Sequence, residues 1–257
     1  MSVLAESHRL ARCRYILRLA DTSLVLGQRL GEWVGHAPAL EEDLALANIA
    51  LDLIGQARLL LTHAGEIEGR GRDEDALAFL RDAPQFCNVS LAEQPNGDFG
   101  QTIMRQFLLD AWQSELYEAL SASTDARLAE IAAKAVKETR YHLRFSAGWL
   151  IRLGDGTAES HARMQQALDA LWRFTDELLT PDALDEEMAA AGMGPSLAAL
   201  RPRWEVRVGE ALQEATLKPP AAARYPWYGK CGVHTEHLGH MLGEMQHLAR
   251  VFPGAAW

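Results

Sequence analysis

Carboxylate, amide and imidazole side chains lie in this sequence where the helices of a metal-binding bundle would carry ligands. A di-iron site of that kind takes one Glu from each of two helices and a Glu-x-x-His turn from each of the other two. Because residues three apart share a helical face, one such turn can place a carboxylate and an imidazole on the same metal. The corresponding positions here are Glu32, Leu53, Gln56, Asp110, Thr139 and His142.

Only three of these side chains, Glu32, Asp110 and His142, are good ligands for iron. Leu53 has no lone pair to give, and Thr139 stands three residues before His142 where a glutamate would be needed. Two carboxylates cannot balance the charge of two iron ions. We therefore expect no metal and no catalytic residue in this chain.

A polar core without a metal must satisfy its own hydrogen bonds, because unpaired polar groups are costly to bury. We expect this pairing among Asp110, His142, Gln56 and Lys137.

Two other interpretations stay open. The chain could itself be a metal-dependent oxidase that uses Glu32, Asp110 and His142, or one that uses the C-terminal histidines. Glu244 and His247 form a literal Glu-x-x-His, but no second turn of this kind matches it, which favours adventitious binding or none. The third interpretation is a free-standing helical binding protein.

The residues that could do chemistry lie on segments with helical periodicity. Long helices are predicted at about 10–34 and 41–64. Two more long helices are predicted where apolar residues recur with helical spacing, over 103–117 and 128–149. The second helix is expected to face the core with Leu44, Ala47, Leu51, Ile54 and Leu61.

Shorter helices are predicted at 73–81, 157–179, 181–190, 195–216 and 234–252, and no strand pattern is present. The predicted connectivity is that of a ferritin-like bundle. It consists of two long helices, an irregular crossover at 83–100 and two further long helices. The prediction is an all-α protein with a single ferritin-like domain over residues 1–257.

Residues 217–231 are predicted to form an irregular arm rich in proline and aromatic residues. Such an arm either docks on a partner or packs on its own bundle. The polar entry to the last helix is a second candidate contact surface. Together these segments supply the possible partner contacts Tyr225, Trp227, Tyr228, His234, Glu236 and His237.

The formal net charge of −10 would repel nucleic acid and an anionic membrane surface, which favours a protein or small-molecule partner. The three cysteines lie far apart and form no disulfide or metal-binding pattern. With no predicted signal peptide or membrane span, the expected location is the cytoplasm.

Four long stretches resemble one known family. They are RLGEWVGHAPALEEDLALANIALDLIGQAR, EQPNGDFG, KAVKETRYHLRFSAGWLIRLGDGT and GVHTEHLGHMLGEMQHL. Together they look like the C subunits of phenylacetyl-CoA ring-1,2-epoxidases, and the resemblance extends over nearly the whole chain.

This resemblance implies a structural, non-catalytic subunit of a bacterial monooxygenase complex in phenylacetate degradation. In that family a related A subunit carries the di-iron site and binds phenylacetyl-CoA, and the C subunit pairs with it and stabilises it. A B subunit and a reductase complete the complex, and the reductase supplies electrons from NADPH through FAD and an iron–sulfur cluster.

Overall fold

The protein is all-α. A computed structural model describes residues 3–221 and 226–255, and within these ranges the backbone forms helices, turns and one isolated bridge between Tyr228 and Val233, with no strand. The chain divides into two compact units, one built from residues up to 94 and from 228 onward, the other from residues 95–227. The predicted fold class is confirmed.

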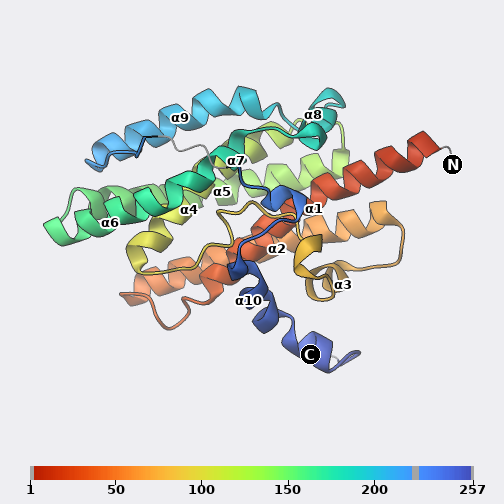
Figure 1. The fold of residues 1–257 in the computed structure, drawn as a ribbon, viewed down its shortest axis with the longest axis horizontal. Coiled ribbons are helices and arrows are strands. Elements are labelled where there is room, and N and C mark those ends of the chain that lie inside the picture. The colour runs from red at the N-terminus through yellow and green to blue at the C-terminus, as the bar shows by residue number, and fades with distance from the viewer. Residues whose placement is uncertain (1–2, 222–225, 256–257) are drawn as a thin grey trace. The chain divides into compact units, whose positions relative to one another are not determined.

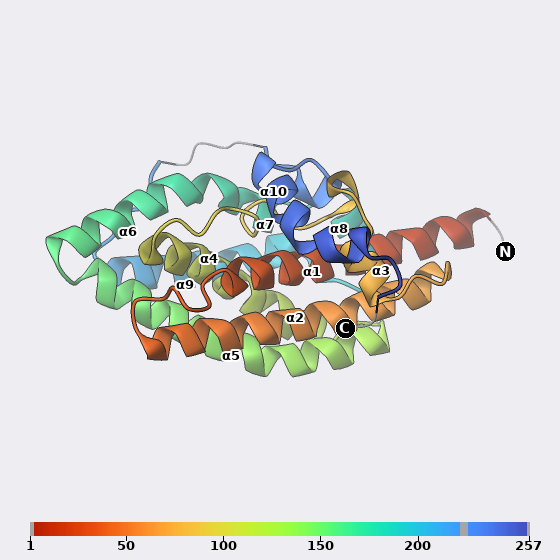
Figure 2. The same ribbon diagram turned by 90° about the horizontal axis from the view of Figure 1, so that it is seen from below.

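The first unit is built on the long helices α1 (Val3–Gly31) and α2 (Leu40–Glu68), which lie side by side (Figures 1 and 2). α1 begins earlier than predicted and ends three residues before its predicted end, whereas α2 continues four residues past its predicted end. α2 ends at Glu68 because Gly69 takes the left-handed conformation with φ of 65° and donates its N–H back to the carbonyl of Gly65. α1 is buried on nearly all sides between Tyr15 and Leu30.

The predicted orientation of α2 is wrong for most of its apolar residues. Leu44, Leu51 and Ile54 were expected in the core but are exposed. The core side instead carries Leu46, Ile49, Ala50, Leu53, Ala57 and Leu60. Because α2 is apolar on two faces, periodicity alone could not identify the buried one.

α2 also has the length and composition of a membrane-crossing helix, the one such helix within the described ranges. The core helix of a bundle has the same composition, and α2 packs along α1.

Short elements complete the first unit. They are α3 (Glu74–Phe79), η1 (Ala83–Gln85), η3 (Gly229–Cys231), α10 (Glu236–Met245) and α11 (His247–Val251). The predicted helix 234–252 is broken at Gln246. The side-chain amide of Gln246 donates to the carbonyls of Ala78 and Arg81 at 3.0 and 2.9 Å, which holds this turn against α3 and the segment that follows it.

The second unit is built around α4 (Phe99–Leu120), which packs against α5 (Ala126–Gly154), α6 (Ala158–Leu171) and α9 (Leu197–Glu214). Aspartate side chains begin α4 and α5, since Asp98 and Asp125 accept N–H groups of the first turn. The predicted helix 157–179 is interrupted by the 3-10 turn η2 (Trp172–Phe174), followed by α7 (Thr175–Leu179) and α8 (Ala183–Ala190).

Each unit thus contributes one pair of long helices, α1 with α2 and α4 with α5, and an irregular crossover joins the pairs in sequence. This connectivity is ferritin-like, as predicted.

Candidate functional site

Three of the predicted ligand positions, Glu32, Leu53 and Gln56, lie in the first unit, and none of them places a carboxylate in the core of that unit. Leu53 and Gln56 are buried on α2, and the Ser23 hydroxyl of α1 donates to Gln56 Oε1 at 3.4 Å. Glu32 was expected to project toward the bundle centre, and this expectation is corrected. α1 ends at Gly31, so Glu32 lies in the exposed turn that follows, where its carboxylate pairs with Arg29 at 2.8 Å.

The second unit holds a buried polar cluster centred on Asp110 of α4. Asp110 Oδ1 accepts from Gln106 Nε2 at 2.6 Å, and Asp110 Oδ2 accepts from Ser146 Oγ of α5 at 2.7 Å. His142, one turn before Ser146, is also fully buried. The hydroxyl of Thr139 donates to the carbonyl of Val136 in its own helix at 3.3 Å. All four residues of this Asp110 cluster, Gln106, Asp110, His142 and Ser146, are closed to solvent.

The predicted pairing around Asp110 was only partly right. Lys137 was expected in the cluster but is exposed on α5. Gln106 and Ser146 were missed, although each lies four residues from a predicted member on the same helix, Gln106 from Asp110 and Ser146 from His142. Such i, i+4 spacing on an inward face is the signal that would have found them.

Burial raises the pKa of the Asp110 carboxyl from 3.8 to about 6. The nearby His142 imidazole and the hydrogen bonds from Ser146 and Gln106 lower this pKa and offset part of the rise. Desolvation therefore outweighs the stabilising contacts, and the folded protein holds the Asp110 proton more tightly than the unfolded chain does.

This pKa predicts how stability changes with pH. As pH rises from about 3 to 7, the unfolded chain releases the Asp110 proton first, so the contribution of Asp110 to the free energy of unfolding falls by about 3 kcal/mol. Asp110→Asn removes this fall. In urea titrations, the stability of the variant relative to wild type is expected to rise by about that amount between pH 3 and pH 7. A stability difference that stays constant with pH would contradict the assignment, and Asp155→Asn, at an exposed position in the same unit, is the matched control.

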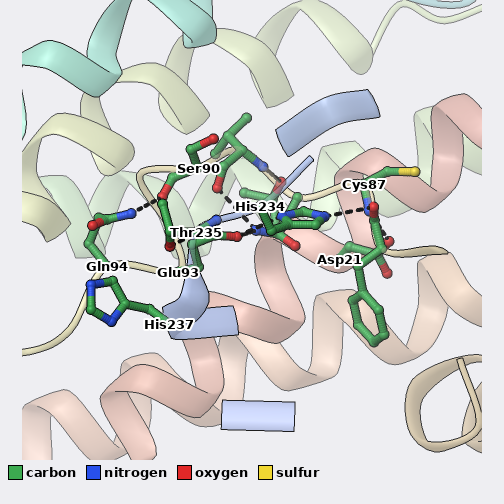
Figure 3. A network of polar contacts seen from close by, with 12 residues as sticks. Asp21, Cys87, Ser90, Glu93, Gln94, His234, Thr235 and His237 are labelled. Atoms are coloured by element: carbon green, nitrogen blue, oxygen red, sulfur yellow. Dashed lines mark hydrogen bonds and ion pairs between the residues drawn. The ribbon is translucent and has the colours of Figure 1, made fainter. Parts of the chain in front are cut away.

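The first unit contains a second buried polar cluster, centred on Glu93 of the crossover (Figure 3). The carboxylate of Glu93 accepts from Asn88 Nδ2 at 2.8 Å. It also contacts His234 Nδ1 at 2.7 Å and accepts from both the backbone N–H and the hydroxyl of Thr235, at 2.6 and 2.8 Å. The Arg29 guanidinium donates to the carbonyl of Glu93 at 2.8 Å. This Glu93 cluster joins α1, the crossover and the segment before α10.

The ring of His234 bridges two acceptors. Nδ1 faces Glu93 and Nε2 faces the carbonyl of Phe86 at 3.0 Å, so a neutral ring can donate to only one of the two acceptors. The preceding backbone lies unusually close to the crossover. Gly232 has a φ of +85°, and a Cβ added there would lie 2.3 Å from the carbonyl oxygen of Pro84.

The Glu93 cluster changes the interpretation of the predicted partner contacts. The side chain of His234 is almost fully buried and bonded within its own unit, so it is not a contact surface. Trp227 packs on Phe174 at 4.5 Å between ring centroids and beneath the Arg173 guanidinium, which places this residue of the arm on its own bundle. Tyr228 and Glu236 are exposed, His237 is half-buried, and Tyr225 lies outside the described residues.

The histidines near the C-terminus do not form a grouped ligand set. Glu244 lies on α10 and His247 begins α11, so the break at Gln246 separates the two members of the literal Glu-x-x-His. Across the described part of the chain, no three or more His, Cys, Asp or Glu side chains are placed to hold a metal ion together.

The chain is similar to known proteins over nearly its whole length. Residues 2–257 match the family model described as phenylacetic acid catabolic protein. The chain is 56% identical over 243 residues to the C subunit of 1,2-phenylacetyl-CoA epoxidase from Escherichia coli (strain K12), a match that covers 95% of this chain and 98% of that relative. The chain belongs to the phenylacetic acid catabolic protein family.

Within this family the ferritin-like fold raises the question of a di-iron centre, and the residues present do not fit one. Such a centre needs four carboxylates and two imidazoles in the bundle core. Of the corresponding buried positions, two carry metal-binding side chains, Asp110 and His142. The other three carry Leu53, Gln56 and Thr139. The Asp110 carboxylate already accepts hydrogen bonds from Gln106 and Ser146.

Proposed function

We propose that this chain is the C subunit of a 1,2-phenylacetyl-CoA epoxidase and that it acts as a structural, non-catalytic subunit. In this role it pairs with the di-iron A subunit and stabilises it. The similarity to the Escherichia coli C subunit over 95% of the chain supports the place in the complex. The shortage of metal-binding side chains around Asp110 supports a non-catalytic role for this chain, because its core cannot supply the carboxylates that two irons need.

The two buried clusters have a structural role in this proposal. The Asp110 cluster joins α4 to α5, and the Glu93 cluster joins the crossover to the segment before α10. Both carboxylates are fully buried, so neither is exposed to a substrate in solution.

The cofactors belong to other components in this proposal. The A subunit holds the di-iron centre, and a reductase brings electrons from NADPH through FAD and an iron–sulfur cluster. A B subunit completes the complex. We place the assembly in the cytoplasm, in keeping with the net charge of −10 and three cysteines that are all free.

Reconstitution tests the proposal. The A subunit, the B subunit, the reductase and this chain are combined, and epoxidation of phenylacetyl-CoA and iron content are measured with and without the chain. Omitting the chain is expected to abolish or strongly reduce turnover. Asp110→Asn and His142→Gln in this chain are expected to leave turnover and iron content within about threefold of wild type, because neither residue binds metal.

The opposite result would favour the metal-dependent oxidase. In that case the purified chain alone would bind iron stoichiometrically, and His142→Gln would remove both the iron and the activity while leaving the helical circular dichroism spectrum unchanged.

A further inference from the structure

The second unit contains an apolar pocket between the segment formed by η2 and α7 and the helix α9. Its volume is about 330 Å³, near the lower end of the range for small-molecule sites in proteins. Buried side chains of Leu179, Val208 and Leu212 line it beside two tryptophans, Trp172 and Trp204. We call it the tryptophan pocket. Its size and apolar lining suit a small, compact and largely apolar ligand.

The two tryptophans give the pocket an aromatic wall. Their ring centroids lie 5.9 Å apart, and their planes are inclined by 35°. Trp204 is held in place, because it is buried and its indole N–H donates to the carbonyl of Leu108 at 3.3 Å. Trp172 is half-buried, so part of its ring remains open for contact. Such a wall favours a flat aromatic ligand, since ring pairs gain more than the burial of their area alone.

The charged side chains of the pocket compensate one another. Two nitrogens of Arg201 contact Asp176 Oδ1 at 3.2 Å, and a nitrogen of Arg201 lies 3.6 Å from Glu205. The second cation of the pocket, Arg173, lies over the ring of Trp227. Two cations and two carboxylates give the pocket no net charge. An ionic ligand therefore gains no net attraction, whereas a neutral polar group finds both donors and acceptors.

The backbone beyond α9 is held in a strained turn beside the pocket. Thr216 has a φ of 59°, the one positive φ at a non-glycine residue within the described ranges, and this conformation is rare for a β-branched residue. The side-chain amide of Gln165 accepts from the N–H of Lys218 at 3.0 Å and donates to its carbonyl at 2.8 Å. These bonds fix the chain just before Pro219, which lines the pocket. Strained backbone of this kind is concentrated at ligand sites.

We propose that the tryptophan pocket is a binding site for an uncharged small molecule with a single aromatic ring. The ring packs on the open part of Trp172, and a neutral polar substituent lies at Arg201 and Asp176. This site goes beyond the proposed function and does not depend on the pairing with an A subunit.

A set of matched compounds tests the class of ligand on the purified full-length chain. Phenylacetamide is the probe, because it joins one benzene ring to a neutral amide that both donates and accepts. In ligand-observed NMR titrations, its Kd is expected to be below about 1 mM. Cyclohexylacetamide lacks the aromatic ring, phenylacetate adds a negative charge and 2-phenylethylammonium adds a positive one. Each of these three is expected to bind at least about fivefold more weakly.

Gly209→Leu tests the location of the site by filling the pocket. Gly209 is an exposed residue of α9 that lines the pocket, and a Cβ added there would meet no atom within 4 Å. The leucine side chain is expected to raise the Kd for phenylacetamide at least about tenfold. The Tm should stay at or above that of wild type, because leucine favours a helix more than glycine does. Gly148→Leu is the matched control, since Gly148 is an equally open helical glycine outside the pocket, and its Kd should stay within about twofold of wild type.

Substitutions of Trp172 test the aromatic wall. Trp172→Ala is expected to raise the Kd for phenylacetamide at least about tenfold, because the open ring surface is lost. Trp172→Phe keeps an aromatic face and should bind within about threefold of wild type. Equal binding by wild type and Trp172→Ala would show that the ring does not contact the ligand.

Other outcomes would also overturn the inference. If phenylacetamide does not bind wild type at concentrations up to about 10 mM, or binds Gly209→Leu equally well, the pocket is not the site. If cyclohexylacetamide binds as tightly as phenylacetamide, the site does not select an aromatic ring. If phenylacetate or 2-phenylethylammonium binds more tightly, the ligand is an ion. None of these results changes the outcome of the reconstitution, so the inference and the proposed function can fail separately.

Discussion

Asp21→Ala is expected to lower the free energy of unfolding by about 3–5 kcal/mol, a large effect for a single substitution. Asp21 of α1 and Arg81 are both buried, and two guanidinium nitrogens of Arg81 contact the two carboxylate oxygens. The backbone N–H of Cys87 donates to the same carboxylate at 2.8 Å. Removing the carboxylate leaves a buried cation and a buried N–H without their acceptor.

Urea denaturation at neutral pH measures this loss. Glu130→Ala is the matched control, because it breaks an exposed ion pair with Arg127, and it should cost less than about 1 kcal/mol. Replacing both partners, with Asp21→Leu and Arg81→Met, should recover much of the stability, since no unpaired charge is left in the core. A loss below about 1 kcal/mol for Asp21→Ala would show that Arg81 finds another acceptor.

Glu93→Ala is expected to have a comparable effect, a loss of about 3–5 kcal/mol, because the carboxylate satisfies buried donors from two segments. Asn88, His234 and both donors of Thr235 lose their shared acceptor. The substitution should also loosen the backbone locally, in addition to lowering the global stability, since the contacts of Glu93 hold the backbone before α10. Amide hydrogen exchange at 233–238 is expected to speed up well before the rest of the unit opens.

Glu93→Gln separates charge from shape at the same position. Glutamine keeps one acceptor but presents an amide N–H₂ to donors, so a smaller loss is expected than for alanine. Glu236→Ala, at an exposed position beside the cluster, should leave both unfolding and hydrogen exchange near wild type. If Glu93→Ala left exchange at 233–238 unchanged, the Glu93 cluster would not be what holds this segment.

Much of the fold follows from local pattern. The long helices and the crossover could be predicted because apolar periodicity and capping residues such as Asp98 and Asp125 act within a few residues. Helix ends were less predictable. Glu32 lies beyond α1 because the helix stops at Gly31. Glycine is common at helix ends, but Gly27 lies inside the same helix, so a glycine alone does not mark the stop.

Features that depend on distant partners could not be predicted from periodicity. Both faces of α2 are apolar, so only tertiary packing selects Leu53 for the core and leaves Leu51 outside. Glu93 and His234 are 141 residues apart, and no helical spacing relates them. They do lie within EQPNGDFG and GVHTEHLGHMLGEMQHL, two of the stretches that carry the family resemblance, and the Glu93 cluster gives a physical reason for residues of these types there.

The first unit is discontinuous in sequence, and this has a consequence for synthesis on the ribosome. Its opening segment ends at Gln94, and its closing segment begins at Tyr228, after the whole second unit. At about 5–20 residues per second, roughly 7–28 s pass between the synthesis of Glu93 and that of His234. The unit that emerges first from the ribosome is therefore completed last, and a chain that terminates before residue 234 lacks the His234 and Thr235 partners of the Glu93 carboxylate.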